Sequence, residues 1–144
     1  SMKQRFDLLV LTLAAMVLVS CASGKISRNY NPLHRQWMLK QMPGFSYQQL
    51  LEAKATINLS DIKHPAGFAG CNHILFKVIT KSGGKIEFRS ISATKKYCAH
   101  NMDLEKSFLK MLTQIKFYRI EGHKITFISN ENEVLAEAIA ADWD

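Results

Sequence analysis

Residues 92–115 read SATKKYCAHNMDLEKSFLKMLTQI and contain the only strong amphipathic helix signal in the second half of the chain. Lys106 and Lys110 lie outside the apolar stripe of this segment and should face solvent. The stripe is compatible with a ligand groove, but packing against a sheet is the better interpretation. We therefore predict one helix at about residues 102–115, with a core face made by Leu104, Phe108, Leu109, Leu112 and Ile115.

Two short polar residues stand near the predicted start of this helix. Either Asn101 or Asp103 is able to accept hydrogen bonds from the free N–H groups of the first turn. Asp103 and Glu105 also place negative charge near the positive end of the helix dipole. The sequence thus predicts a side-chain cap at the N-terminus of the helix.

Alternating apolar residues predict strands on both sides of the helix. Between them, Ser46 is able to cap a short helical turn. The expected strands lie near residues 36–40, 55–59, 74–80, 86–90, 117–120, 125–128 and 134–139. The predicted fold class is α+β and mostly β. We expect a compact antiparallel sheet or partly closed barrel of about seven strands, with one packed helix.

The first twenty residues have the pattern of an export signal. Ser1 precedes the first methionine and is interpreted as an expression scar. Lys3 and Arg5 come before an apolar run at 8–19, which is shorter than the ~20 residues that a membrane-spanning helix needs. The segment LVSC, which ends at Cys21, resembles a bacterial lipobox. In such a motif the cysteine sulfur carries diacylglycerol and the signal is cleaved just before it.

We therefore expect a lipid-anchored protein in three parts: a signal peptide at 1–20, the lipidated Cys21 with a tether at 21–34, and a domain at 35–144. An ordinary secretory signal with a nearby cysteine is the alternative. Ala22 follows the cysteine where some lipoproteins carry aspartate. By the sorting rule of enterobacteria-like lipoproteins, this favours the outer membrane with the domain in the periplasm, and surface exposure stays open.

The charge of the chain is basic but dispersed. The formal net charge is +7, and removal of the signal peptide lowers it to +6 because Lys3, Arg5 and Asp7 leave together. The sequence has no block of five like charges and no RNA- or DNA-binding motif. We expect solvated lysines that favour anionic lipid or envelope polymer, and no nucleic-acid partner.

The cysteine count fits an exported protein. If Cys21 is lipidated, Cys71 and Cys98 remain as a pair for an oxidising compartment, and a disulfide is the leading interpretation. Two buried free thiols are an alternative. A zinc site is another, because His73 and His100 each follow a cysteine at the second position. A catalytic cysteine with a histidine base is the least favoured. Asn72 is interpreted as a turn residue, and we expect no cofactor.

Several segments match one known family in order and spacing. The matching residues are Trp37 and Leu39, Gly67, Gly70, Cys71 and Asn72, Ala93, Thr94 and Cys98, and Leu104, Glu105 and Phe108. With these residues the chain resembles the META domain family, which includes the HslJ-like heat-shock lipoproteins, over roughly residues 36–140. In that family an aromatic residue, a glycine and a tyrosine usually follow the Gly-Cys-Asn element at alternate positions. Here these positions hold Ile74, Phe76 and Val78.

The resemblance implies a compact, mostly antiparallel β fold with one helix and no established catalysis. It also implies a role in stress response, envelope integrity or tolerance of some antibiotics. We therefore expect a non-enzymatic, monomeric envelope lipoprotein that binds or protects an envelope protein or polymer. The alternative is a small β-fold inhibitor or a host-interaction lipoprotein.

Overall fold

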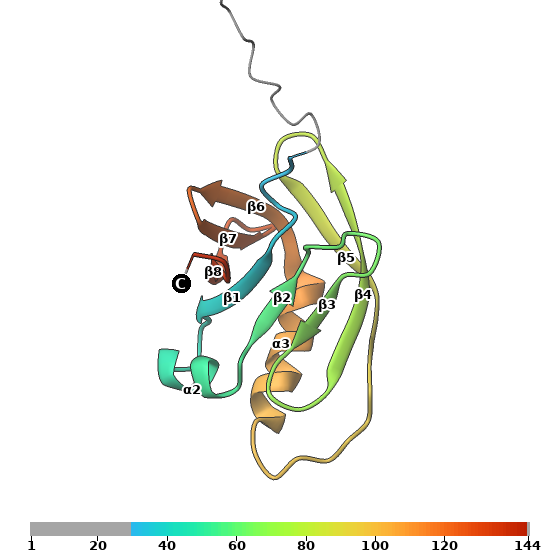
Figure 1. Ribbon diagram of the computed structural model, residues 1–144, viewed down its shortest axis with the longest axis vertical. Coiled ribbons are helices and arrows are strands. Elements are labelled where there is room, and N and C mark those ends of the chain that lie inside the picture. Colours follow the sequence, from blue (N-terminus) through green and yellow to red (C-terminus); the bar gives the residue numbers. More distant parts are fainter. Residues whose placement is uncertain (1–29, 144) are drawn as a thin grey trace, which may run out of the picture. The chain divides into compact units, whose positions relative to one another are not determined.

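The computed structural model of the protein describes residues 30–143 and contains a closed barrel of eight antiparallel strands (Figure 1). The predicted signal peptide, Cys21 and most of the predicted tether lie outside the described residues. Among the described residues, two helices accompany the barrel, α2 (Tyr47–Glu52) and α3 (Met102–Gln114). The strands are β1 (Gln36–Gln41), β2 (Thr56–Asn58), β3 (Ala66–Phe68), β4 (His73–Lys81), β5 (Lys85–Ala93), β6 (Ile115–Glu121), β7 (Lys124–Ser129) and β8 (Val134–Ala140).

The first and last strands close the barrel. β1 pairs with β8 in antiparallel register, with Trp37 opposite Ala140. The pairing of β5 with β6 is the shortest in the barrel, because it consists of a single pair of opposed residues, Lys85 and Phe117. Helix α3 forms the connection between these two strands and lies along the barrel (Figure 1). The circular order of the pairings leaves no strand at the end of the sheet.

The predicted helix is confirmed, because α3 spans Met102–Gln114. The short turn after Ser46 is also present as α2, with a capping box between Ser46 and Gln49. The prediction of about seven strands in a partly closed barrel misses β3. This strand has three residues, lies between the strands expected at 55–59 and 74–80, and completes the closed ring.

The core fills the barrel with side chains from both sheet and helix. Trp37, Phe108 and Phe127 are fully buried. The ring of Phe88 makes edge-to-face contacts with Phe76 and Phe127, at centroid distances of 5.0 and 6.1 Å. The indole N–H of Trp37 donates a hydrogen bond to the carbonyl of Leu33, so the core already includes a residue that we expected in the tether.

The predicted core face of α3 is largely correct. Four of the five residues predicted for this face are buried, namely Leu104, Phe108, Leu112 and Ile115, and Leu109 is half-buried. Lys106 and Lys110 are exposed, as predicted. Met111 is an addition to this face and is also buried. Within residues 30–143 no helix is long and apolar enough to cross a membrane.

Candidate functional site

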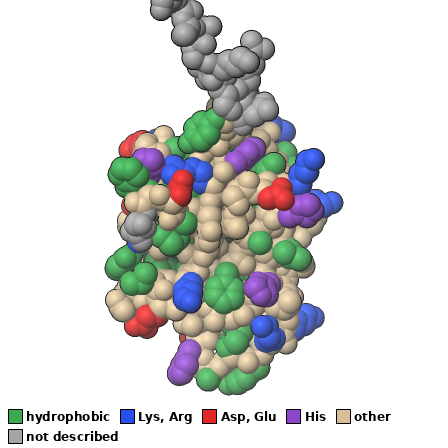
Figure 2. All heavy atoms as spheres, in the orientation of Figure 1, with side chains coloured by type: hydrophobic (Ala, Val, Ile, Leu, Met, Phe, Trp, Pro, Cys, Tyr) green, Lys and Arg blue, Asp and Glu red, His purple; other side chains and the backbone are tan. Residues whose placement is uncertain are grey.

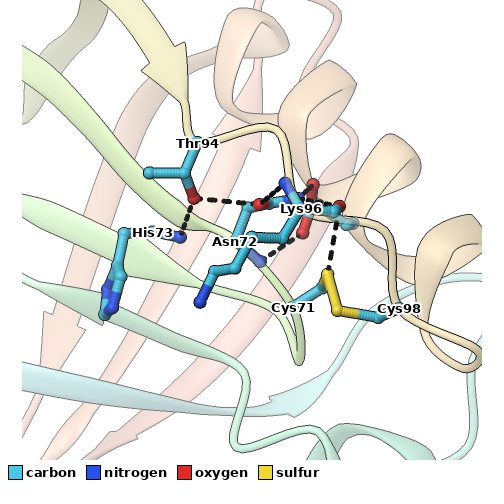
Figure 3. The surroundings of a disulfide bond; sticks show 7 residues. Cys71, Asn72, His73, Thr94, Lys96 and Cys98 are labelled. Atoms are coloured by element: carbon cyan, nitrogen blue, oxygen red, sulfur yellow. Dashed lines mark hydrogen bonds between the residues drawn. A yellow bond between two sulfur atoms is a disulfide. The ribbon is translucent and has the colours of Figure 1, made fainter.

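The two cysteines of the domain form a disulfide, as predicted (Figure 3). Cys71 lies between β3 and β4, and Cys98 lies in the segment that leads from β5 to α3. Their Cα atoms are 6.0 Å apart, within the range of about 4.4–6.8 Å that disulfides adopt. Because each sulfur is bonded to the other, neither is available as a thiolate ligand or nucleophile. The zinc and catalytic-cysteine alternatives are therefore wrong for the oxidised protein.

Asn72 is the centre of a hydrogen-bond network beside this disulfide (Figure 3). Its side chain is buried, and its Oδ1 accepts from the backbone N–H of Lys96 at 2.7 Å and from Thr94 Oγ1 at 2.9 Å. Its Nδ2 donates to the carbonyl of Lys96 at 3.2 Å. Asn72 lies at the bend between β3 and β4, in agreement with its interpretation as a turn residue, and it is not among the described residues with positive φ. It joins the end of β5 to the start of β4.

Glu105 completes the network from the first turns of α3. Its carboxylate is buried and accepts two hydrogen bonds from Asn72, one from the backbone N–H at 2.8 Å and one from Nδ2 at 2.9 Å. Hydrogen bonds to a charged group are stronger than neutral ones, at about 1.5–3 kcal/mol each. Glu105 therefore holds the helix to the β3–β4 junction, a role that its position near the helix dipole did not predict.

Thr94 is the third polar member of the network. Its hydroxyl donates to Asn72 Oδ1 and accepts from the backbone N–H of His73 at 3.1 Å. Within residues 30–143 every buried side-chain nitrogen or oxygen has a hydrogen-bond partner. The polar groups of this network are thus satisfied by one another, as stable buried networks require.

Gly70 allows the chain to pass close to the start of α3. Its φ of +98° is unfavourable for residues with a side chain, and a Cβ there would lie 2.6 Å from Nδ2 of Asn101. Asn101 occupies the N-cap position with φ of 71°, but its side chain makes no capping hydrogen bond. The predicted side-chain cap is therefore wrong. The side chain of Asn101 packs against Gly70 instead.

The two histidines of the Cys-x-His pairs are exposed on the surface. The ring of His73 lies 5.9 Å from that of Phe68, as measured between centroids. Among the described residues, no group of three or more histidine, cysteine, aspartate or glutamate side chains is placed to hold a metal ion.

An exposed segment leaves the network between β5 and the disulfide. Lys95, Lys96 and Tyr97 are exposed, and the side chain of Tyr97 is 87% exposed, the largest fraction among the described large apolar residues. The backbone N–H and carbonyl of Lys96 are bound to Asn72, and the disulfide fixes Cys98. The segment 95–97, which we call the stapled loop, is therefore held at both sides while its side chains face solvent.

A closed eight-stranded barrel, a packed helix and a disulfide at the helix start define a small disulfide-linked β-barrel domain. The chain belongs to the META domain family, which matches residues 31–142. Of the residues that carry the resemblance to this family, Cys71 forms the disulfide and Asn72, Thr94 and Glu105 form the network. Phe108 lies in the core, and Gly70 packs against Asn101 at the start of α3.

Two solved structures share the fold. An NMR structure of a protein from Burkholderia xenovorans has a TM-score of 0.58 and 22% sequence identity, and the match covers 85% of this chain and 97% of that one. A second NMR structure has the same TM-score with 16% identity, covering 79% of this chain and 97% of the other. Comparison with curated proteins gives no match. At these identities the structural likeness shows the fold alone.

Breaking the disulfide should destabilise the domain strongly. The bridge closes a loop across 27 residues, for which the chain-entropy argument gives about 3.5 kcal/mol. Reduction, or replacement Cys98→Ser, should therefore lower the melting temperature by at least several degrees. Circular dichroism melts with and without reductant measure this. A reductant effect of the same size in the Cys98→Ser protein would show that the stabilisation comes from elsewhere.

Proposed function

We propose that the protein is a non-enzymatic, lipid-anchored domain of the bacterial envelope that supports envelope integrity under stress by binding an envelope component. The observation that carries this proposal is the Asn72 network. The motif residues Asn72, Thr94 and Glu105 direct their polar groups to one another and to backbone atoms. Their arrangement supports a role in positioning a surface rather than in reacting with a substrate.

The stapled loop is the surface that we propose for binding. A buried network and a covalent bond hold its backbone, so little conformational entropy is lost when a partner docks. Tyrosine gives a large contact area at low entropic cost, and the two lysines add attraction for anionic groups. The loop therefore suits an anionic envelope polymer with sugar rings that stack on Tyr97.

The rest of the surface offers less for such a partner. On the face shown in Figure 2, lysine and arginine side chains are spread among neutral groups and do not form one stripe. This distribution agrees with the scattered lysines of the sequence and supports a partner other than nucleic acid. A local binding loop is then a better explanation of affinity than the overall charge.

Binding to purified envelope polymer tests this proposal. Co-sedimentation with peptidoglycan sacculi should retain the protein, and Tyr97→Ala should reduce the retained fraction several-fold. Tyr47→Ala is the matched control, because Tyr47 is also an exposed tyrosine, 48% exposed, but lies on α2. Equal retention of both variants would reject the loop as the binding surface. Recovery of one recurrent protein partner, with no polymer binding, would favour the inhibitor or host-contact class instead.

The proposed lipid anchor has its own test. The charged start, the short apolar run and the LVSC segment motivate it. Labelled palmitate should enter the protein in a native-type bacterial host, and Cys21→Ser should abolish the label. In fractionation the labelled protein should follow the outer membrane. Persistent labelling of the Cys21→Ser protein would remove the assignment of the lipobox.

A further inference from the structure

A second feature of the domain is a cleft of about 260 Å³ between the β4–β5 hairpin and the start of β6. Its apolar wall is formed by Ile79, Ile86 and Phe117. The polar lining residues are Lys81, Lys85, Glu87, Lys116 and Asn130. The cleft therefore combines an apolar wall with three ammonium groups, one carboxylate and one side-chain amide.

The side chains that line this cleft carry more positive than negative charge. The single carboxylate, Glu87, accepts a hydrogen bond from Arg89 at 2.9 Å and lies 3.9 Å from Lys116. The hydrogen bond from Arg89 is the main cause that lowers the pKa of Glu87, so this group is ionised and already paired at neutral pH. In the described part of the chain, Lys81 and Lys85 have no carboxylate within 4.0 Å. Positive charge thus remains available at the hairpin.

The position of the cleft in the barrel suggests its partner. The β4–β5 turn lies at one end of the long axis in Figure 1, and the described chain starts at the same end. The connection between β5 and α3, which holds the stapled loop, lies at the opposite end (Figure 1). Nine residues lie between Cys21 and Asn31, so this stretch spans at most about 35 Å. A lipid on Cys21 would keep this end of the barrel within reach of the bilayer.

We propose that the cleft binds the phosphate group of a membrane lipid headgroup. The lysines Lys81, Lys85 and Lys116 attract the phosphate as point charges, and the amide of Asn130 is available to donate to an oxygen. The apolar wall accepts the first carbons of the lipid. This choice of a lipid as the source of phosphate rests on the proposed anchor, whereas the phosphate chemistry of the cleft does not. The domain would then lie with its hairpin end on the bilayer and its stapled loop away from it.

Titration with a soluble phosphate tests the chemistry of the cleft. Glycerol 3-phosphate, added to the ¹⁵N-labelled full chain at constant ionic strength, should shift the amide signals of Lys81, Lys85 and Lys116 in a saturable way. The variant Lys81→Gln/Lys85→Gln should lose these shifts. The control Lys106→Gln/Lys110→Gln removes the same charge from exposed positions of α3 and should keep them. Shifts that do not saturate, or that persist in the hairpin variant, would overturn the phosphate site.

Vesicles test the source of the phosphate. Both variants and the parent chain carry the same N-terminal region, so any difference between them reports on the lysines. Co-sedimentation with vesicles of equal parts phosphatidylcholine and phosphatidylglycerol should be about five-fold weaker for each hairpin lysine lost, and unchanged for the α3 control. Equal binding of the two variants to vesicles, together with saturable phosphate shifts, would overturn the proposal that the phosphate belongs to a lipid. The ligand of the cleft would then be a soluble phosphate compound. Failure of palmitate labelling would remove the anchor without changing the titration.

Discussion

Replacement Phe108→Ala is expected to lower the free energy of unfolding by about 3–5 kcal/mol, the range for deletion of a large aromatic side chain from a core. The ring of Phe108 is fully buried. It also lies against β3, because a Cβ built on Gly67 would be 3.1 Å from one of its ring carbons. The neighbouring strand therefore has no side chain at this point that could move into the space left by the ring.

Urea denaturation of the purified protein measures this effect, with Lys110→Ala as the control on the same helix. Lys110 is exposed, so its truncation should change the free energy of unfolding by no more than about 0.5 kcal/mol. Leu112→Ala, which is also buried, should cost about 2–5 kcal/mol. Similar losses for Lys110→Ala and Phe108→Ala would mean that the assigned core face of α3 is wrong.

The parts of the fold that could be predicted are those with a local pattern. The period of α3 and the two long hairpins are visible because each apolar repeat or turn lies within one short segment. β3 was missed because it has three residues, Ala66–Phe68, which is too short for a period to be recognised. Its pairing with β2 and β4 comes from the closure of the barrel rather than from its own sequence.

The departure from the family pattern after Asn72 also has a structural explanation. Ile74 and Phe76 are buried, and Val78 is half-buried against the core. These positions alternate along β4 and face the interior of the barrel. The different residues at these three positions therefore change the packing of the core. They do not alter the stapled loop, which consists of residues 95–97.

The network around Asn72 could not be predicted from the residues alone. Asn72 and Glu105 are 33 residues apart, so no periodicity or local motif connects them. The resemblance to the META domain family placed these residues in one motif but gave them no physical role. The predicted cap failed for a related reason. Asn101 has a suitable side chain, but contact with Gly70 and a left-handed backbone determine where that side chain lies.

Replacement Glu105→Ala is expected to lower the free energy of unfolding by about 3 kcal/mol or more, because two hydrogen bonds to a charged acceptor are worth about 1.5–3 kcal/mol each. The change would leave the backbone N–H and the Nδ2 of Asn72 without their acceptors in a buried site. Glu105→Gln should also destabilise the protein. Its amide offers one oxygen, so one of the two donors from Asn72 would face an N–H group instead.

A double-mutant cycle separates this network from a simple effect of charge at the helix start. If Glu105 acts through Asn72, the costs of Asn72→Ala and Glu105→Ala should not add, and the interaction energy should be about 0.5–3 kcal/mol.

Asp103→Ala is the matched control, because Asp103 is an exposed acid in the same first turn of α3. Its loss removes only the favourable interaction with the helix dipole, worth about 0.3–1 kcal/mol. Equal costs for Asp103→Ala and Glu105→Ala, with additive effects in the cycle, would mean that Glu105 stabilises the protein only through its interaction with the helix dipole. Strong coupling would identify the Asn72–Glu105 contact as the bond that holds α3 beside the stapled loop.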